Sequence, residues 1–405
     1  MSAFGGAGGA GGAGGAGGAG GAGGAGGAGG AGGAGGVGLD AGIGVKGAIP
    51  GYTPLQSTGI LLAGDGISGP WKDITRPPKV LKSENPKNMR LWAPWVRSFI
   101  LENEILSRLA FRVSNSGSGE PWVAIWHRDF DTNLLPGEKG DPETLKPKHI
   151  DPVFLASLQR PTRANFVEQL KLVRGYSDLR SDRYAEILTQ VGFPTEYFSA
   201  IAGFHPERTR YTLELIALAQ GFAATISMRV KHALACLRPD AYSVQIQPII
   251  PTPGHGSLPA AHAVEAFIVS EMLKHLIDPA GGNIDLRRML DRQAARISTN
   301  RVVAGVHFPA DSISGAMLGQ TLGQYFAARA GGGVGKNQVE VEPGKFIGPR
   351  VGGTDFHLTD LMKVDGGKWV RQEKGAIELR DPVKDIAASP PLAWLWAQAK
   401  KEWTV

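Results

Sequence analysis

The hydrophobic positions of this chain recur mostly at the spacing of amphipathic helices. In 85–113 the apolar side chains that fall on one helical face are Leu91, Trp95, Phe99, Ile100, Leu106 and Leu109. The same periodicity occurs in 151–174, 181–192, 206–236, 259–277, 284–297 and 311–329. The best strand-like alternation is the short stretch 242–250. The pattern therefore predicts an all-α fold with a helical-bundle core.

Both ends of the chain differ from this helical body. Gly-Gly-Ala repeats dominate the first 38 residues, and glycine loses the most backbone entropy on ordering, so 1–38 is predicted to be a disordered arm. Gly and Pro are frequent in 39–84, which is predicted to be an extended segment packed on the core. Residues 331–405 are predicted to wrap around the body through their tryptophans. The helical domain that carries the chemistry is then 85–330.

Composition narrows the range of partners. The 405 residues include 43 Lys+Arg and 37 Asp+Glu, a net charge of +6. There is no basic stripe with interleaved aromatic residues, so no nucleic-acid partner is predicted, whereas an anionic ligand is favoured. The one cysteine, Cys236, lies in a helical pattern and is interpreted as a buried apolar residue rather than a nucleophile.

No signal peptide or membrane-spanning segment is evident. The N-terminus lacks a basic region followed by an apolar one. The most apolar run, 213–228, is interrupted by Glu214 and Gln220. The sequence thus predicts a cytoplasmic protein with no membrane partner.

Two basic residues stand at the end of one predicted helix, just before a possible anion site. Lys231 and Arg238 are two helical turns apart, so they share a face where the helix ends at Pro239. Pro259 is expected at the first helical position, with the amides of Ala260 and Ala261 in the first turn, where no carbonyl inside the helix can reach them. Such free amides at the positive end of a helix bind anions.

The histidines that could act on a bound anion follow in the sequence. His262 comes directly after these amides and is a candidate general acid or base. Arg301 supplies a third cation, six residues before His307. Asp311 is one helical turn beyond His307, so it could accept a hydrogen bond from one ring nitrogen and leave the other facing the anion.

Three motifs together resemble a known signature: Lys231-x6-Arg238-Pro239, Pro259-x-x-His262 and Arg301-x5-His307-x3-Asp311. This pattern is similar to that of the superfamily of type 2 phosphatidic acid phosphatases, bacterial acid phosphatases and vanadium-dependent haloperoxidases. The resemblance implies that Lys231, Arg238 and Arg301 bind the oxyanion and that His262 is the acid/base. It makes His307 either a phosphorylated nucleophile or the ligand of vanadium.

The chain departs from the family's pattern in the second and third motifs. Ala260 and Ala261 replace the Ser and Gly of the usual Pro-Ser-Gly-His, which removes one hydroxyl donor to the anion. Asn300 stands where Ser is usual. An oxyanion is still expected to bind, but less tightly.

The resemblance leaves three functions open. A haloperoxidase that oxidises halide with hydrogen peroxide at a His307-bound vanadate is favoured by the expected lack of a membrane segment, by the chain length and by His255, seven residues before His262. The first alternative is a soluble acid phosphatase that cleaves phosphate monoesters through a phosphohistidine, with phosphate in place of vanadate. The second is a catalytically impaired relative with a binding or assembly role. A homo-oligomer is compatible with all three.

Overall fold

The computed structural model describes residues 54–404, except 71, 74, 77, 115–118, 132–147, 150, 335–336 and 385. The α-helices are α3 (Pro54–Ile67), α4 (Pro94–Leu106), α5 (Arg163–Gly175), α6 (Arg180–Thr189), α7 (Thr195–Ala202), α8 (Arg210–Leu234), α9 (Pro239–Tyr242), α10 (Ala261–Ile277), α11 (Ile284–Val303), α12 (Pro309–Arg329) and α13 (Pro390–Lys401). The 3-10 helices are η2 (Pro86–Leu91), η3 (Tyr176–Leu179), η4 (Val244–Ile246), η5 (Gly348–Arg350) and η6 (Leu358–Asp360).

The strands form one large sheet and three small ones. The large sheet has the order β1-β2-β5-β8-β11, formed by Leu109–Ser114, Trp122–His127, Val153–Gln159, Gly344–Phe346 and Ile377–Leu379. Its neighbouring strands are antiparallel except β5 and β8, which are parallel. The two-stranded pairs are β3 (Phe130–Asp131) with β4 (Lys148–His149), β6 (Gly333–Val334) with β7 (Asn337–Gln338), and β9 (Met362–Asp365) with β10 (Lys368–Arg371).

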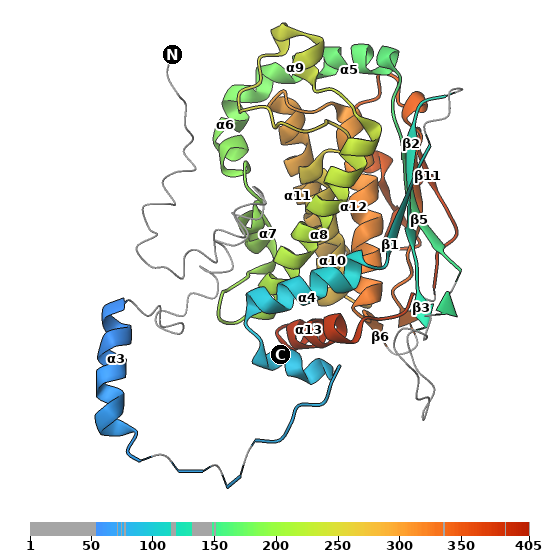
Figure 1. Ribbon diagram of the computed structural model, residues 1–405. Helices are drawn as coiled ribbons and strands as arrows, with labels where there is room; N and C mark the ends of the chain where they lie inside the picture. The colour runs from blue at the N-terminus through green and yellow to red at the C-terminus, as the bar shows by residue number, and fades with distance from the viewer. Residues whose placement is uncertain are drawn as a thin grey trace.

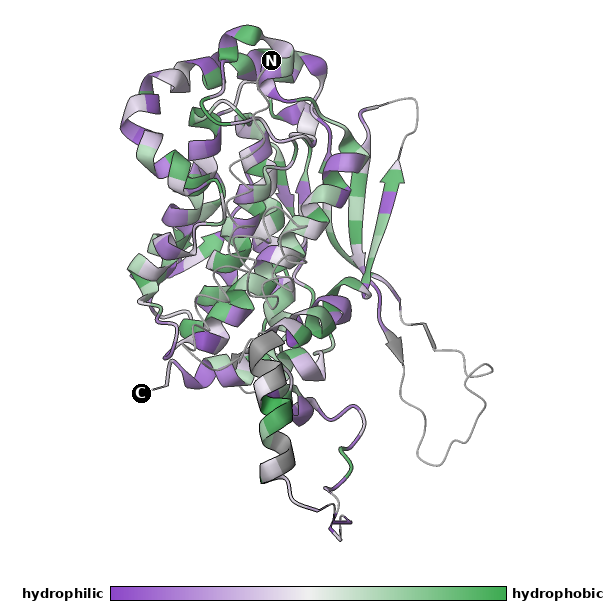
Figure 2. Cartoon of the chain, turned by 60° about the vertical axis from the view of Figure 1, so that its left-hand side comes forward, coloured by the Kyte–Doolittle hydropathy of each residue, from purple (hydrophilic) through white to green (hydrophobic). Residues whose placement is uncertain are grey.

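The helices α8, α10, α11 and α12 form the centre of the molecule, and the large sheet lies along one side of them (Figures 1 and 2). Every residue of α12 is buried, as are most residues of α10. Most residues of both helices are apolar or glycine, which fits their place at the centre of the bundle.

The close approach of α10 and α12 depends on glycines spaced four residues apart in α12. A Cβ atom added at Gly315 would lie 2.8 Å from the carbonyl oxygen of Ala260, and one added at Gly319 would lie 2.6 Å from that of Val264. At Gly323 it would lie 2.5 Å from the Cβ atom of Glu271. Only glycine therefore permits this helix separation, which brings the beginning of α10 next to the beginning of α12.

The all-α prediction is wrong in part, because the five-stranded sheet covers the bundle. Segments 109–113 and 153–159, expected to be helical, are strands β1 and β5. Short apolar runs of this length cannot be assigned to helix or strand by periodicity alone, and pairing with β2 decides in favour of strands here. Conversely, 242–250 is not a strand: it contains η4, and Gln247 has a φ of 44°.

Only part of the N-terminal region lies within the described residues. The Gly-Gly-Ala arm 1–38 lies outside the described residues, as does 39–53. Residues 54–67, expected to be extended and packed on the core, form helix α3, whose described residues are exposed. Helix α3 stands apart from the body in Figure 1.

The C-terminal helix α13 packs on α8, and the residues just after α13 cap the N-terminus of α8. The carboxylate of Glu402 accepts hydrogen bonds from the backbone amides of Tyr211 and Thr212, both at 2.9 Å. The indole nitrogen of Trp403 donates to the Thr212 hydroxyl at 2.9 Å. A carboxylate at this position satisfies amides that have no partner inside the helix and opposes the helix dipole.

One described helical span, Arg210–Tyr242, is long and apolar enough to cross a membrane, with a mean hydropathy of 1.3. It includes α8, and 61% of its most apolar window is buried inside the molecule. Near its beginning, the Glu214 carboxylate forms a buried ion pair with Arg97 of α4 at 2.6 Å.

We predict that Gly319→Ala lowers the free energy of unfolding by about 1–3 kcal/mol, because the added methyl group forces α10 and α12 apart. Urea unfolding followed by circular dichroism measures this. The matched control is Gly221→Ala in α8, where an added Cβ atom meets nothing within 4 Å. That change should stabilise by about 0.5–1 kcal/mol through helix propensity. Equal effects of the two substitutions would contradict the packing argument.

Candidate active site

Two basic side chains are buried and hydrogen-bonded to main-chain carbonyl groups. Lys231 lies at the end of α8, and Arg238 lies in the loop that follows. The Lys231 ammonium donates to the carbonyl oxygens of Gly256 at 2.8 Å and Ser257 at 2.7 Å. The Arg238 guanidinium donates to the carbonyl oxygens of His255 at 3.1 Å and Val306 at 2.7 Å. Neutral acceptors fix both side chains without cancelling their charge.

His307 lies between Arg238 and Asp311. Its Nδ1 atom is 2.9 Å from the Asp311 carboxylate, and its Nε2 atom is 3.0 Å from Nη1 of Arg238. The Asp311 carboxylate accepts at Nδ1, so the Nε2 lone pair points toward the guanidinium. The structure thus pairs the two residues as the sequence spacing suggested, with Nε2 on the side of the cations.

The Asp311 carboxylate also connects neighbouring segments. It accepts hydrogen bonds from the Ser257 hydroxyl and, at 2.9 Å, from the backbone amide of Phe308. The carbonyl oxygen of Asp311 accepts from the amide of Ala260 at 2.9 Å. Ser257 was not predicted from the sequence, and its hydroxyl serves Asp311 rather than replacing the hydroxyl lost at Ala260.

The Ala260 amide was expected to be free for an anion, and this expectation is wrong. Helix α10 begins at Ala261 rather than Pro259, with Ala260 as its N-cap, and the Ala260 amide is used by Asp311. The amides of Ala261 and His262 occupy the first turn instead, beyond the reach of carbonyls within the helix. The free donors of the helix end are therefore shifted by one residue.

Arg301 and His262 meet at a residue that the sequence did not reveal, Gln190. The backbone carbonyl of Gln190 accepts from Nη1 of Arg301 at 3.2 Å and lies 2.9 Å from Nε2 of His262. Its side-chain oxygen accepts from Arg301 and from Asn300, at 3.2 and 2.9 Å. Gln190 lies just after α6, far from the motifs in sequence, so only the fold could identify it.

Each of the three cations retains an N–H for which no hydrogen-bond acceptor is found among the described residues. Lys231 has three donors and uses two, and Arg238 has five and uses four, the fourth toward Nδ1 of His255 at 3.1 Å. The buried Nε of Arg301 has no hydrogen-bond partner. Unused buried donors from three chain segments are what a tetrahedral oxyanion requires, so the residues fit phosphate or vanadate.

The pKa values of the basic groups in the site are lowered, which favours an anionic ligand. Burial, reinforced by Arg238, lowers the pKa of Lys231 to about 7. Burial also lowers the pKa of Arg301 to about 10, and burial together with Arg301 lowers that of His262 to about 3. The pKa of His307 is lowered well below its usual value by burial, then by Arg238 and Lys231. Both imidazoles are therefore neutral at neutral pH, and a bound anion would raise all four pKa values.

Glu265 is a further buried group that the sequence analysis missed. It lies one helical turn after His262 on α10, and among the described residues it has no hydrogen-bond or ion-pair partner. Burial raises its pKa to about 7, against the opposing effect of Lys231 and Arg301. The only signal in the sequence was its spacing of three from His262, which places both on one helical face.

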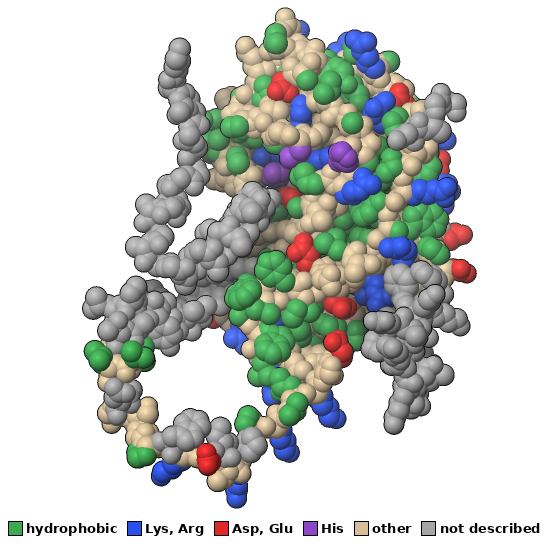
Figure 3. All heavy atoms as spheres, viewed as in Figure 1, with side chains coloured by type: hydrophobic (Ala, Val, Ile, Leu, Met, Phe, Trp, Pro, Cys, Tyr) green, Lys and Arg blue, Asp and Glu red, His purple; other side chains and the backbone are tan. Residues whose placement is uncertain are grey.

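The histidines open onto the surface. His255 and His262 are partly exposed. Figure 3 shows histidine side chains next to lysine and arginine side chains on the upper part of one face. Solvent and a small anion can thus reach the candidate site.

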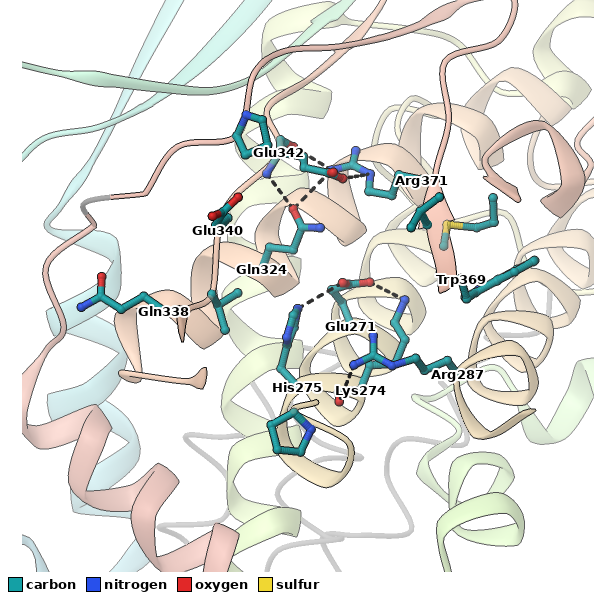
Figure 4. A pocket seen from close by; sticks show the side chains of 15 residues that line it. Glu271, Lys274, His275, Arg287, Gln324, Gln338, Glu340, Glu342, Trp369 and Arg371 are labelled. Atoms are coloured by element: carbon teal, nitrogen blue, oxygen red, sulfur yellow. Dashed lines mark hydrogen bonds and ion pairs between the residues drawn. The ribbon is translucent and has the colours of Figure 1, made fainter. Parts of the chain in front are cut away.

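A second cavity, of about 290 Å³, is lined by none of these residues (Figure 4). Its charged groups largely pair with one another: Lys274 contacts Glu271 at 2.5 Å and Asp291 at 3.0 Å. Within the described part of the chain no group of three or more His, Cys, Asp or Glu side chains could hold a metal ion.

The comparisons with known proteins found one matching family model and similar solved structures. The model of the PAP2 superfamily matches residues 211–329. Among solved structures, one similar chain is the crystal structure of the first transmembrane PAP2 type phosphatidylglycerolphosphate phosphatase from Bacillus subtilis. It is 20% identical with a TM-score of 0.32, covering 40% of this chain and 83% of that one. A comparison with curated proteins gave no match.

The prediction of a cytoplasmic protein without a membrane-spanning segment is wrong on these findings. Arg210–Tyr242 is long and apolar enough to cross a membrane, judged by its length and composition. Glu214 seemed to interrupt this run, but its charge is paired with Arg97.

The matched segment contains every site residue predicted from the sequence: His255, Ala260, Ala261 and His262, the cations Lys231, Arg238 and Arg301, and the pair His307 and Asp311. Over residues 211–329 the chain is similar to the PAP2 superfamily.

Proposed function

We propose that the protein is a phosphatase that cleaves phosphate monoesters through a phosphohistidine at His307. The observation that carries this proposal is the placement of a neutral imidazole whose Nδ1 is held by Asp311 and whose Nε2 faces buried cations. A neutral, oriented imidazole beside unused N–H donors has what a nucleophile toward a phosphoryl group needs.

In the first step the free donors of Lys231, Arg238 and Arg301 bind the phosphoryl oxygens. The His307 Nε2 atom forms a bond to phosphorus, and the bond from phosphorus to the ester oxygen breaks. His262 delivers a proton to the leaving oxygen. Its pKa of about 3 rises when the anion neutralises Arg301, which is the main charge that lowers it besides burial.

In the second step water attacks the phosphorus atom of the phosphohistidine. His262, neutral after the first step, accepts a proton from this water, the bond from phosphorus to Nε2 breaks, and inorganic phosphate leaves. The three cations stabilise the charge on the equatorial oxygens in both steps. Asp311 keeps the His307 ring in one orientation throughout.

The superfamily match favours this function over haloperoxidation. The sequence-based preference for a haloperoxidase rested partly on the absence of a membrane-spanning helix, and that premise no longer holds. A vanadate-dependent haloperoxidase remains the second candidate because His255 lies 3.1 Å from Arg238, where it could move protons. Bound vanadate would supply Lewis-acid activation of hydrogen peroxide, held by His307 and the same cations.

We predict that the protein hydrolyses p-nitrophenyl phosphate, that orthovanadate inhibits it, and that His307→Ala lowers kcat by about a thousandfold or more, because the nucleophile is lost. The release of p-nitrophenol measures this. His232→Ala, an exposed histidine next to Lys231, is the matched control and should leave kcat unchanged.

The opposite pattern would favour the second candidate. Preparations loaded with orthovanadate would then oxidise bromide or iodide with hydrogen peroxide, dependent on His307, while p-nitrophenyl phosphate stays intact. That result would contradict the phosphatase proposal.

We predict that sulfate binding weakens by at least about tenfold between pH 6 and pH 8.5. As pH rises through about 7, Lys231 loses its positive charge and Glu265 gains a negative charge, and both changes oppose anion binding. Sulfate does not titrate in this range, so isothermal calorimetry reports the protein groups alone. Glu265→Gln should remove part of the dependence. A pH-independent affinity in both proteins would show that neither group faces the anion.

A further inference from the structure

The surface of α4 and the residues just before it carries a group of exposed apolar side chains. We call Leu91, Trp92, Trp95 and Phe99 the aromatic patch; they are 53%, 40%, 59% and 63% exposed. The rings of Trp95 and Phe99 touch edge to face, with centroids 6.4 Å apart. Hydrophobic side chains gather over α4 in Figure 3. Two large aromatic side chains packed on each other yet open to solvent indicate an interaction surface.

Helix α3 adds a second apolar surface that nothing in the described chain covers. The exposed residues are Ile60, Leu61, Leu62 and Ile67. The helix stands off the body in the view of Figure 1. The chain from 54 to 99 thus offers apolar side chains at both of its ends.

Between these two apolar surfaces the chain is strongly basic. The exposed cations are Lys72, Arg76, Lys79, Lys82, Lys87 and Arg90, against the two acidic residues Asp73 and Glu84. The stretch 72–90 therefore has a net charge of 6 − 2 = +4, two thirds of the +6 of the whole chain. Val80 and Leu81, also exposed, lie among these cations.

From these observations we infer that residues 54–99 dock the protein on an anionic lipid surface, with the aromatic patch and α3 inserted at the interface and the cations of 72–90 at the head groups. Tryptophan suits the boundary between water and lipid because its ring is apolar and its N–H is polar. Each lysine or arginine near an anionic surface adds to the attraction, and combined apolar and basic contacts give stable peripheral binding.

The docking surface lies at the opposite end of α8 from the candidate site. Arg97 of α4 holds Glu214 near the beginning of α8, whereas Lys231 lies seventeen residues further along. At 1.5 Å per residue these positions are about 25 Å apart. Docking would therefore anchor the protein without covering the site, and the inference does not rest on the proposed function.

Co-sedimentation of the full chain with vesicles tests this. We expect binding to vesicles of phosphatidylcholine with 30% phosphatidylglycerol to be at least about tenfold stronger than to pure phosphatidylcholine and to weaken with salt. Trp95→Ala/Phe99→Ala and Lys79→Glu/Lys82→Glu/Lys87→Glu should each reduce this binding about tenfold or more. Val364→Ala, which removes an exposed apolar side chain elsewhere, is the control and should bind as the parent does.

Circular dichroism of each variant and light scattering of the parent accompany the assay, because the same surface could join two copies of this chain. Folded variants that bind vesicles as the parent does would overturn the inference. The inference would also be overturned if the parent protein does not bind vesicles but forms a dimer that Trp95→Ala/Phe99→Ala dissociates. That result would assign the aromatic patch to contact with a second copy of this chain. Phosphatase activity is not the readout, so failure here is distinct from failure of the proposed function.

Discussion

The buried carboxylate of Asp311 is the interaction on which the site depends. Its carboxylate accepts hydrogen bonds from the His307 imidazole, the Ser257 hydroxyl and the Phe308 amide. The carbonyl oxygen of the same residue accepts one from the Ala260 amide. These contacts join the loop before α10 to the beginning of α12. They can form only because the glycines of α12 allow α10 to approach so closely. The orientation of His307 is thus a consequence of helix packing.

Around this carboxylate the protein buries more positive than negative charge. Lys231, Arg238 and Arg301 are fixed by main-chain carbonyls and by Gln190, and neutral acceptors leave their charges uncompensated. Burying unpaired charge is costly, which is why the pKa values of Lys231 and Arg301 are lowered. A bound oxyanion removes this cost. The buried cations therefore favour the binding of an anion.

The sequence predicted which residues lie close together, such as His307 and Asp311, better than it predicted the fold class. The spacing between His307 and Asp311 is short and helical, so their pairing followed from one periodicity. Gln190 could not be found, because its contacts with His262 and Arg301 depend on how α6 packs against α11. Strands β1 and β5 were mistaken for helices because short apolar runs fit both periods, and pairing with β2 decides between them. The Ala260 amide was misassigned because its partner, the carbonyl of Asp311, is more than fifty residues away.

The most direct test of the phosphohistidine account is mass spectrometry of protein quenched during turnover of p-nitrophenyl phosphate. The phosphohistidine mechanism predicts an acid-labile phosphoryl group on the peptide that contains His307, and no such group in His307→Ala. If His262→Ala still reacts with p-nitrophenyl phosphate, whose leaving group is activated, the phosphoryl group should accumulate in that variant. A phosphoryl group on another residue, or turnover at a normal rate in His307→Ala, would contradict it.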